Sequence, residues 1–175
     1  PVRPVTMRLT RFYGRREFRD SPDCYAARMP RHLYFDLDGT LTDPYEGITR
    51  CIVYALDKLG FPRPTDEYLF SCIGPSLYIT FPEMVGKDLT PRAIDLYRER
   101  FNDVGWLENV PYEGIHDALA EIAATDCVMF VATAKPRIAA KRIIEHFEMG
   151  QYFEKVYGCE LDGTRADKAD LLSFA

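Results

Sequence analysis

Three short apolar runs along the chain have the length and composition of buried β-strands. They are residues 32–36, 127–132 and 156–158. The second run is apolar throughout, which is typical of a parallel strand covered on both faces. Apolar residues recur at helical spacing over residues 115–124, 136–147 and 166–174. This alternation of strands and helices predicts right-handed crossovers and an α/β fold, with a three-layer, Rossmann-like parallel sheet as its core.

A block of helices and loops separates the first strand from the others. Residues 47–109 contain helical patterns and no convincing strand pattern. A helix over 48–59 ends at Gly60, and further helices are expected after Thr65, near 77–85 and over 90–103. We therefore expect an all-helical domain at 47–109, inserted into a core made of residues 29–46 and 110–175.

Composition places the chain among ordinary globular proteins. It has 175 residues, of which 47% are hydrophobic and 28% are charged. Apolar runs stay well short of the roughly 20 residues that cross a bilayer, so no membrane contact is predicted. The five cysteines are scattered, odd in number and never spaced as CxxC. This pattern indicates reduced thiols in a cytoplasmic protein and disfavours a disulfide framework or a zinc site.

Charge is distributed unevenly along the chain. Residues 1–28 contain seven arginines and three acids, although the whole chain has a net charge of −5. The acidic remainder is a poor match for nucleic acid. We expect residues 1–28 to be a basic, poorly ordered extension or sequence upstream of a start at Met29. An organelle-targeting arm and a nucleic-acid-binding arm are the alternatives.

Two carboxylates at the end of the first strand are the strongest chemical signal. Asp36 and Asp38 follow an apolar run and precede Gly39, which permits a sharp turn with backbone N–H groups facing a phosphate. Two close carboxylates repel unless a cation neutralises them, and Mg²⁺ binds through one or two carboxylates, waters and phosphate oxygens. Asp36 is then a candidate nucleophile toward phosphorus, and Asp38 a candidate general acid and base.

Other polar residues are expected at the same edge of the sheet, where ligands of parallel sheets bind. Thr133 follows the second strand and can hydrogen-bond a phosphoryl oxygen, while Lys168 begins the last helix and can balance the charge of Asp36 and phosphate. Each also has a plain structural interpretation, as a helix cap and a polar helix start. Lys135, next to Pro136, is expected to point to solvent, and a role in binding the substrate is the alternative.

These motifs together resemble the haloacid dehalogenase-like hydrolase superfamily, in its phosphoglycolate phosphatase-like subgroup with a helical cap. The segment DLDGTLTD at 36–43 is similar to the family's first motif, VATAKP at 131–136 to the second, and Lys168 in RADKADLL to the third. The resemblance covers residues 32–175. It implies that Asp36 is the nucleophile and a metal ligand, and that Asp38 is the general acid and base and gives the metal its backbone carbonyl. Thr133 and Lys168 would hold the phosphoryl group, with the turn amides of Leu37 and Ala134 nearby.

The implied function is a Mg²⁺-dependent phosphatase for a small phosphorylated metabolite, such as phosphoglycolate, a nucleotide or a sugar phosphate. The family's fourth motif, an acidic pair that completes the metal site, would follow the helix at Lys168. The chain ends at Ala175, so we expect a fragment that lacks the C-terminal part of the core. A sugar phosphomutase and a non-catalytic fragment are the alternatives, and the oligomeric state stays open.

Overall fold

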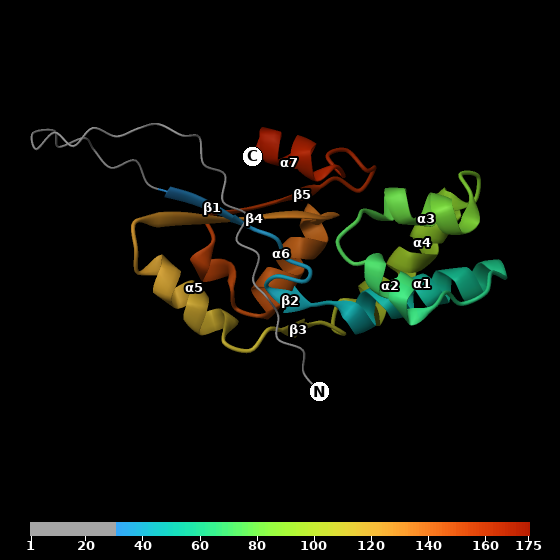
Figure 1. Ribbon diagram of the computed structural model, residues 1–175, viewed down its shortest axis with the longest axis horizontal. Helices are drawn as coiled ribbons and strands as arrows, with labels where there is room; N and C mark the ends of the chain where they lie inside the picture. Colours follow the sequence, from blue (N-terminus) through green and yellow to red (C-terminus); the bar gives the residue numbers. More distant parts are fainter. Residues whose placement is uncertain (1–30) are drawn as a thin grey trace, which may run out of the picture. The chain divides into compact units, whose positions relative to one another are not determined.

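The computed structural model describes residues 31–175 (Figure 1). The predicted extension at residues 1–28 lies outside the described residues. The elements in chain order are β1 (Arg31–Phe35), β2 (Thr42–Asp43), α1 (Tyr45–Leu59), α2 (Asp66–Ser71), α3 (Leu77–Val85), α4 (Thr90–Arg100), the π-helix η1 (Phe101–Gly105), β3 (Val110–Pro111), α5 (Ile115–Ala123), β4 (Cys127–Pro136), α6 (Arg137–His146), the 3₁₀ helix η2 (Gly150–Tyr152), β5 (Lys155–Cys159) and α7 (Lys168–Phe174).

A parallel three-stranded sheet in the order β1-β4-β5 forms the centre of the fold. Phe35 of β1 pairs with Val131 of β4, and Val131 pairs with Val156 of β5. The predicted α/β class with a parallel sheet is thus confirmed. The register also brings the carboxyl ends of β1 and β4 to the same edge, which is where the chemical motifs follow in sequence.

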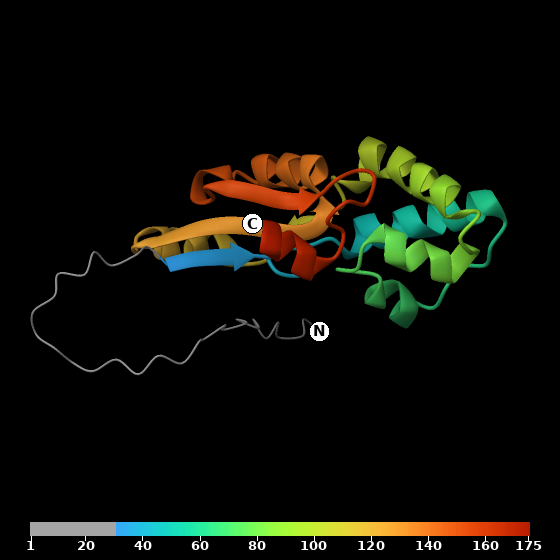
Figure 2. The same cartoon turned by 90° about the horizontal axis from the view of Figure 1, so that it is seen from above.

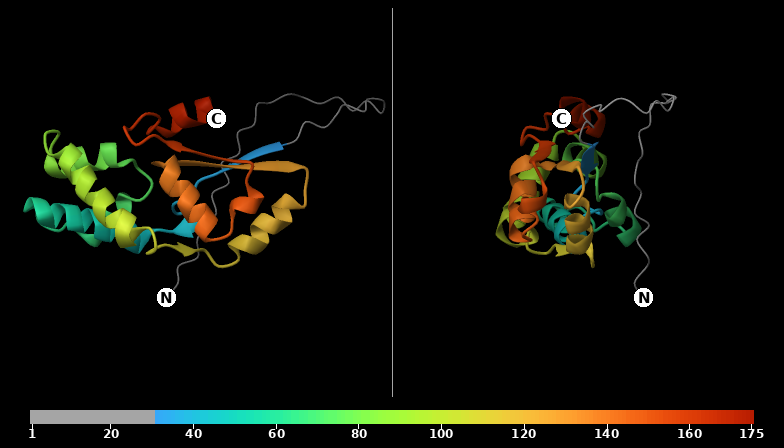
Figure 3. Two further views of the ribbon diagram at one scale, coloured as in Figure 1. Left: turned by 180° about the vertical axis from the view of Figure 1, so that it is seen from behind. Right: turned by 90° about the vertical axis from the view of Figure 1, so that its left-hand side faces the viewer.

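Helices cover both faces of this sheet. Helices α5 and α6 lie on one face and α7 on the other (Figures 1 and 3). On the α7 face, Tyr34 stacks on Phe130 with 5.0 Å between ring centroids, and Tyr157 meets Phe174 of α7 edge-on at 6.2 Å. Since successive strand residues point to opposite faces, Phe35 faces α5 and α6, as its exposure of 7% reflects. The predicted three layers are therefore present.

The helical insertion, α1 to η1, lies beyond the carboxyl ends of the strands (Figure 2). Its helices begin where the sequence offers caps: the Thr65 hydroxyl accepts from the Tyr68 N–H, and the Ser76 hydroxyl from the Tyr78 N–H. Strands β2 and β3, which flank the insertion, pair antiparallel. These two-residue strands and the π-helix after α4 carried no signal in the sequence. Within residues 31–175, the helices fall short of the length and apolarity that a membrane span requires.

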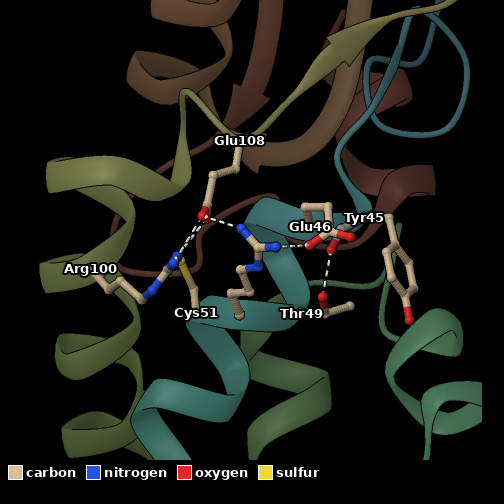
Figure 4. A network of polar contacts seen from close by, with 7 residues as sticks. Tyr45, Glu46, Thr49, Cys51, Arg100 and Glu108 are labelled. Carbon is tan, nitrogen blue, oxygen red and sulfur yellow. Dashed lines mark hydrogen bonds and ion pairs between the residues drawn. The ribbon is translucent and has the colours of Figure 1, made fainter.

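A polar network joins the insertion to the segment that returns to the sheet (Figure 4). The Glu108 carboxylate accepts two hydrogen bonds from Arg100, at 2.7 and 3.0 Å, and one from Arg50 at 2.7 Å. Arg50 also pairs with Glu46, one turn earlier in α1. A single carboxylate therefore ties α1 and α4 to the residues that lead into β3.

Candidate active site

Asp36 and Asp38 lie directly after β1, in a loop that several backbone hydrogen bonds hold together. The Leu37 carbonyl accepts from the N–H groups of residues 40, 41 and 42, and the Gly39 N–H donates to the Thr42 carbonyl at 2.8 Å. Gly39 has a φ of +77°, which side-chain-bearing residues rarely adopt. Leu37 is fully buried between the two acids. The loop therefore anchors its middle residue in the core and holds both carboxylates at the sheet edge.

Asp36 is paired with Lys168 from the other end of the described chain. The Lys168 ammonium donates to Asp36 Oδ2, and the Leu37 N–H donates to Asp36 Oδ1 at 2.9 Å. Lys168 is the first residue of α7, and the Asp167 carboxylate caps this helix by accepting from the Ala169 N–H at 2.8 Å. The structure thus brings two of the predicted site residues into direct contact.

Asp38 is paired with a different lysine, Lys135. Asp38 Oδ2 lies 3.0 Å from Lys135 Nζ, and the two side chains are only 9% and 6% exposed. Burial raises the pKa of Asp38 above its ordinary value, and the Lys135 ammonium opposes that rise. The expectation that Lys135 points to solvent is wrong. Strand β4 continues to Pro136. Because residues two apart in a strand point to the same face, the Lys135 side chain lies on the same buried face as that of Thr133.

Thr133 lies at the same edge and is almost completely buried. Its hydroxyl accepts a hydrogen bond from the Lys135 N–H at 3.2 Å, and the residue is 1% exposed. Thr133 therefore orders the end of β4 in this structure. Its predicted contact with a phosphoryl group stays a prediction.

A cavity of about 520 Å³ opens between this edge and the helical insertion. On the sheet side it is lined by Asp38, Ala134 and Lys135. On the insertion side its lining comes from the loop before α3 and from α3, α4 and η1, and includes Gly74, Pro75, Ser76, Tyr78, Tyr97 and Phe101. Asp36, Gly39, Thr133 and Lys168 are outside this lining, so the cavity reaches the predicted site through Asp38 and Ala134.

Several lining residues were missed by sequence reasoning, among them three near the end of α4. Tyr97, Arg98 and Phe101 fall at the end of an amphipathic helix, where apolar residues ordinarily predict only helix packing. Burial raises the pKa of Tyr97 well above that of a free tyrosine, so its hydroxyl stays protonated. The periodicity of α4 identifies a buried face but contains no signal for the cavity that this face borders.

The family model for haloacid dehalogenase-like hydrolases matches residues 33–170. The chain belongs to this family. The match spans both strand-end motifs, the helical insertion and Lys168, as the motif resemblance predicted. This haloacid dehalogenase-like hydrolase fold also accounts for a parallel sheet whose carboxyl edge faces an inserted helical unit.

Two relatives are similar to most of this chain. A 5′-nucleotidase of Pseudomonas aeruginosa is 42% identical over 149 residues, which cover 84% of this chain and 67% of that protein. The tyrosine-protein kinase PtkA of Mycobacterium tuberculosis is 36% identical over 83% of this chain and 50% of its own length. The chain thus spans between half and two thirds of these relatives.

A solved structure shows the same fold. The crystal structure of a predicted phosphatase from Clostridium acetobutylicum is 36% identical and superposes with a TM-score of 0.78, covering 82% of this chain and 68% of that one. This likeness extends over the sheet and the helical insertion together.

Proposed function

We propose that this haloacid dehalogenase-like hydrolase is a Mg²⁺-dependent phosphatase that hydrolyses a small phosphomonoester through an aspartyl-phosphate on Asp36. One observation carries the proposal: two carboxylates at one strand end are each held by a separate lysine, Asp36 by Lys168 and Asp38 by Lys135. Identical side chains in different surroundings can take different roles, one as a nucleophile and the other as a proton donor.

The chain's own residues account for both half-reactions. An Asp36 carboxylate oxygen attacks phosphorus, the bond from phosphorus to the leaving oxygen breaks, and Asp38 gives that oxygen its proton. In the second half, Asp38 takes a proton from water as the water oxygen attacks the phosphorus, and phosphate leaves with Asp36 restored. Burial of Asp38 supports the first step, because it favours the protonated form of the carboxyl. Lys168 stabilises the negative charge that gathers beside Asp36.

The donors at the β1 terminus fit part of a Mg²⁺ site. Asp36 offers a hard carboxylate whose side chain is 25% exposed, and Asp38 would offer its backbone carbonyl oxygen, which leaves the Asp38 carboxyl group free for proton transfer. The described residues contain no cluster of three or more His, Cys, Asp or Glu side chains suited to a metal. Mg²⁺ usually keeps several waters and binds through one or two carboxylates with substrate phosphate, so Asp36 and the Asp38 carbonyl would form part of its site. When bound, the metal would neutralise the charge of the carboxylates and the phosphate.

The cavity favours a leaving group with an aromatic or apolar surface. Its volume of about 520 Å³ is within the usual range for small-molecule sites, and the rings of Tyr78, Tyr97 and Phe101 line its insertion side. A nucleoside fits this chemistry better than glycolate does, which agrees with the 5′-nucleotidase among the relatives. We therefore place nucleoside monophosphates first among the candidate substrates.

Phosphate release from a panel of monophosphates tests this proposal. The full-length protein with Mg²⁺ is expected to hydrolyse nucleoside 5′-monophosphates faster than phosphoglycolate, and EDTA is expected to remove the activity until Mg²⁺ is restored. Interconversion of sugar phosphates without phosphate release would instead indicate a phosphomutase. Absence of turnover on the whole panel would contradict the proposed activity.

The cytoplasmic location also stays a prediction, supported by free thiols at Cys51, Cys72, Cys127 and Cys159.

A further inference from the structure

Lys135 is a buried cation at the border of the cavity. Its residue exposure is 9%, its ammonium lies 3.0 Å from Asp38 Oδ2, and its Nζ lies 4.8 Å from the centroid of the Phe101 ring. A lysine that loses its hydration needs a partner of opposite charge. Asp38 supplies that charge, and the aromatic face of Phe101 adds a favourable contact from the helical insertion.

The two oxygens of the Asp38 carboxyl group have different surroundings. Oδ2 is engaged by Lys135, whereas Oδ1 is buried and has no hydrogen-bond partner among residues 31–175. An ammonium has only donors to offer, so it occupies an oxygen that accepts. A proton on the Asp38 carboxyl group must then be carried by Oδ1. Asp38 and Lys135 both line the cavity, so this carboxyl group borders the space that a substrate would occupy.

We propose that Lys135 is a positioning residue for the proton-transfer group: it holds Oδ2 of Asp38 so that Oδ1 is presented to the leaving oxygen of the substrate. This inference rests on the proposed phosphatase function and assigns Lys135 no contact with the phosphoryl group. The Phe101 ring of the insertion adds a second contact to the same ammonium, at 4.8 Å from the ring centroid, and so helps to hold it beside Asp38.

The backbone that turns Lys135 inward depends on a glycine in the neighbouring strand. The pairing of β4 with β5 is irregular between Thr133 and Pro136. A Cβ on Gly158 of β5 would lie 2.6 Å from the Lys135 carbonyl oxygen and 2.7 Å from the Cα of Arg137. Such distances are far below van der Waals contact, so only glycine allows β4 to approach here. Gly158 thus sets the position of Lys135 from outside the site.

A lysine at this place could alternatively bind the phosphoryl group, and the choice of substrate separates the two roles. A phosphate ligand contributes to every phosphomonoester. A residue that positions the general acid matters only when the leaving oxygen needs a proton, as in alkyl phosphates. p-Nitrophenolate leaves without protonation, so p-nitrophenyl phosphate bypasses the general acid. The ratio kcat/KM reports the first phosphoryl transfer for both substrates and is independent of the later hydrolysis of the phospho-enzyme.

The test is Lys135→Met in the full-length protein with Mg²⁺, measured on a nucleoside 5′-monophosphate and on p-nitrophenyl phosphate. Loss of effective proton transfer is expected to lower kcat/KM about 100-fold on the alkyl phosphate, and less than about 5-fold on p-nitrophenyl phosphate. In an Asp38→Asn background, Lys135→Met is expected to add almost nothing, because the two residues act as one unit. Lys141→Met, an exposed lysine on α6, is the matched control and should leave both values unchanged.

Equal losses on the two substrates, or losses that multiply with Asp38→Asn, would overturn the inference and assign Lys135 to phosphate binding. If Lys135→Met does not fold, Lys135→Gln is measured in its place, because glutamine is neutral, can form hydrogen bonds and is of similar length. Lys135→Arg keeps the cation and is expected to restore most of the wild-type ratio between the substrates. A wild-type protein that hydrolyses neither substrate would refute the proposed function itself, which is a different outcome from either loss pattern.

Discussion

The Tyr78 hydroxyl, on helix α3 of the insertion, donates a hydrogen bond of 2.6 Å to the Leu161 carbonyl. Leu161 belongs to the loop between β5 and α7, and the Arg98 guanidinium of α4 donates to the same carbonyl at 2.6 Å. Figure 2 shows this loop reaching toward the insertion helices. The loop leads directly to Lys168, so the contact links the insertion to the segment that delivers the partner of Asp36.

Removal of the Tyr78 hydroxyl should weaken this link without disturbing the core. Tyr78→Phe deletes one neutral hydrogen bond, worth about 1 kcal/mol, and is expected to lower kcat/KM roughly 5-fold while thermal unfolding changes little. Tyr68→Phe is the matched control, because the Tyr68 hydroxyl bonds to Glu83 within the insertion at 3.3 Å. Similar kinetic losses in both variants would show that the Leu161 contact has no special role.

Asp36→Asn should abolish turnover in the full-length protein while the fold remains intact. An amide cannot form the acyl-phosphate, and its loss of charge removes the partner of Lys168. Phosphate release and far-UV circular dichroism measure the two properties. Asp95→Asn, at an exposed position of α4, is the control. Near-normal hydrolysis by Asp36→Asn would exclude the proposed nucleophile.

Asp38→Asn should slow the second half-reaction and trap the phospho-enzyme. The amide cannot take a proton from water, so the aspartyl-phosphate on Asp36 is expected to accumulate when a substrate with an acidic leaving group is used. Intact-protein mass spectrometry under acidic quench would detect the added phosphoryl group. A variant that shows neither a trapped phosphoryl group nor a slower turnover would remove Asp38 from the mechanism.

Glu108 should contribute stability that depends on pH. Hydrogen bonds from Arg100, and then from Arg50, lower the pKa of Glu108 below its unfolded value of 4.5, and the side chain is 16% exposed. A lowered folded pKa adds stability above the unfolded pKa, and this stability is lost as the pH falls below about 4.5 through the folded value. Urea unfolding monitored between pH 3 and 7 measures the effect.

Glu108→Gln should therefore lower the free energy of unfolding at pH 7 by about 1–3 kcal/mol and flatten its decline in acid. The network in Figure 4 explains the size of this loss, because two guanidinium groups share the one carboxylate. Glu121→Gln, at an exposed position of α5, is the control. Parallel acid profiles for wild type and Glu108→Gln would refute the assignment.

Local sequence determined the three strands of the parallel sheet, most helices and the edge at which the chemistry lies. The apolar run before Asp36, the turn at Gly39 and the continuous apolar run of β4 are local signals, because strand burial and turn geometry depend on neighbouring residues. Parallel pairing then places the carboxyl ends of β1 and β4 together. The predicted proximity of Asp36 and Lys168 followed from this topology, although 132 residues separate them in sequence.

Tertiary structure alone decided the environment of each side chain at that edge. Whether Lys135 faces solvent or Asp38 depends on where β4 ends and on the space that Gly158 leaves in β5. The lining of the cavity by Phe101 and the bond from Tyr78 to Leu161 depend on how the insertion packs against the sheet edge. Periodicity reports which face of an element is buried, whereas the partner across that face is set by contacts between distant segments.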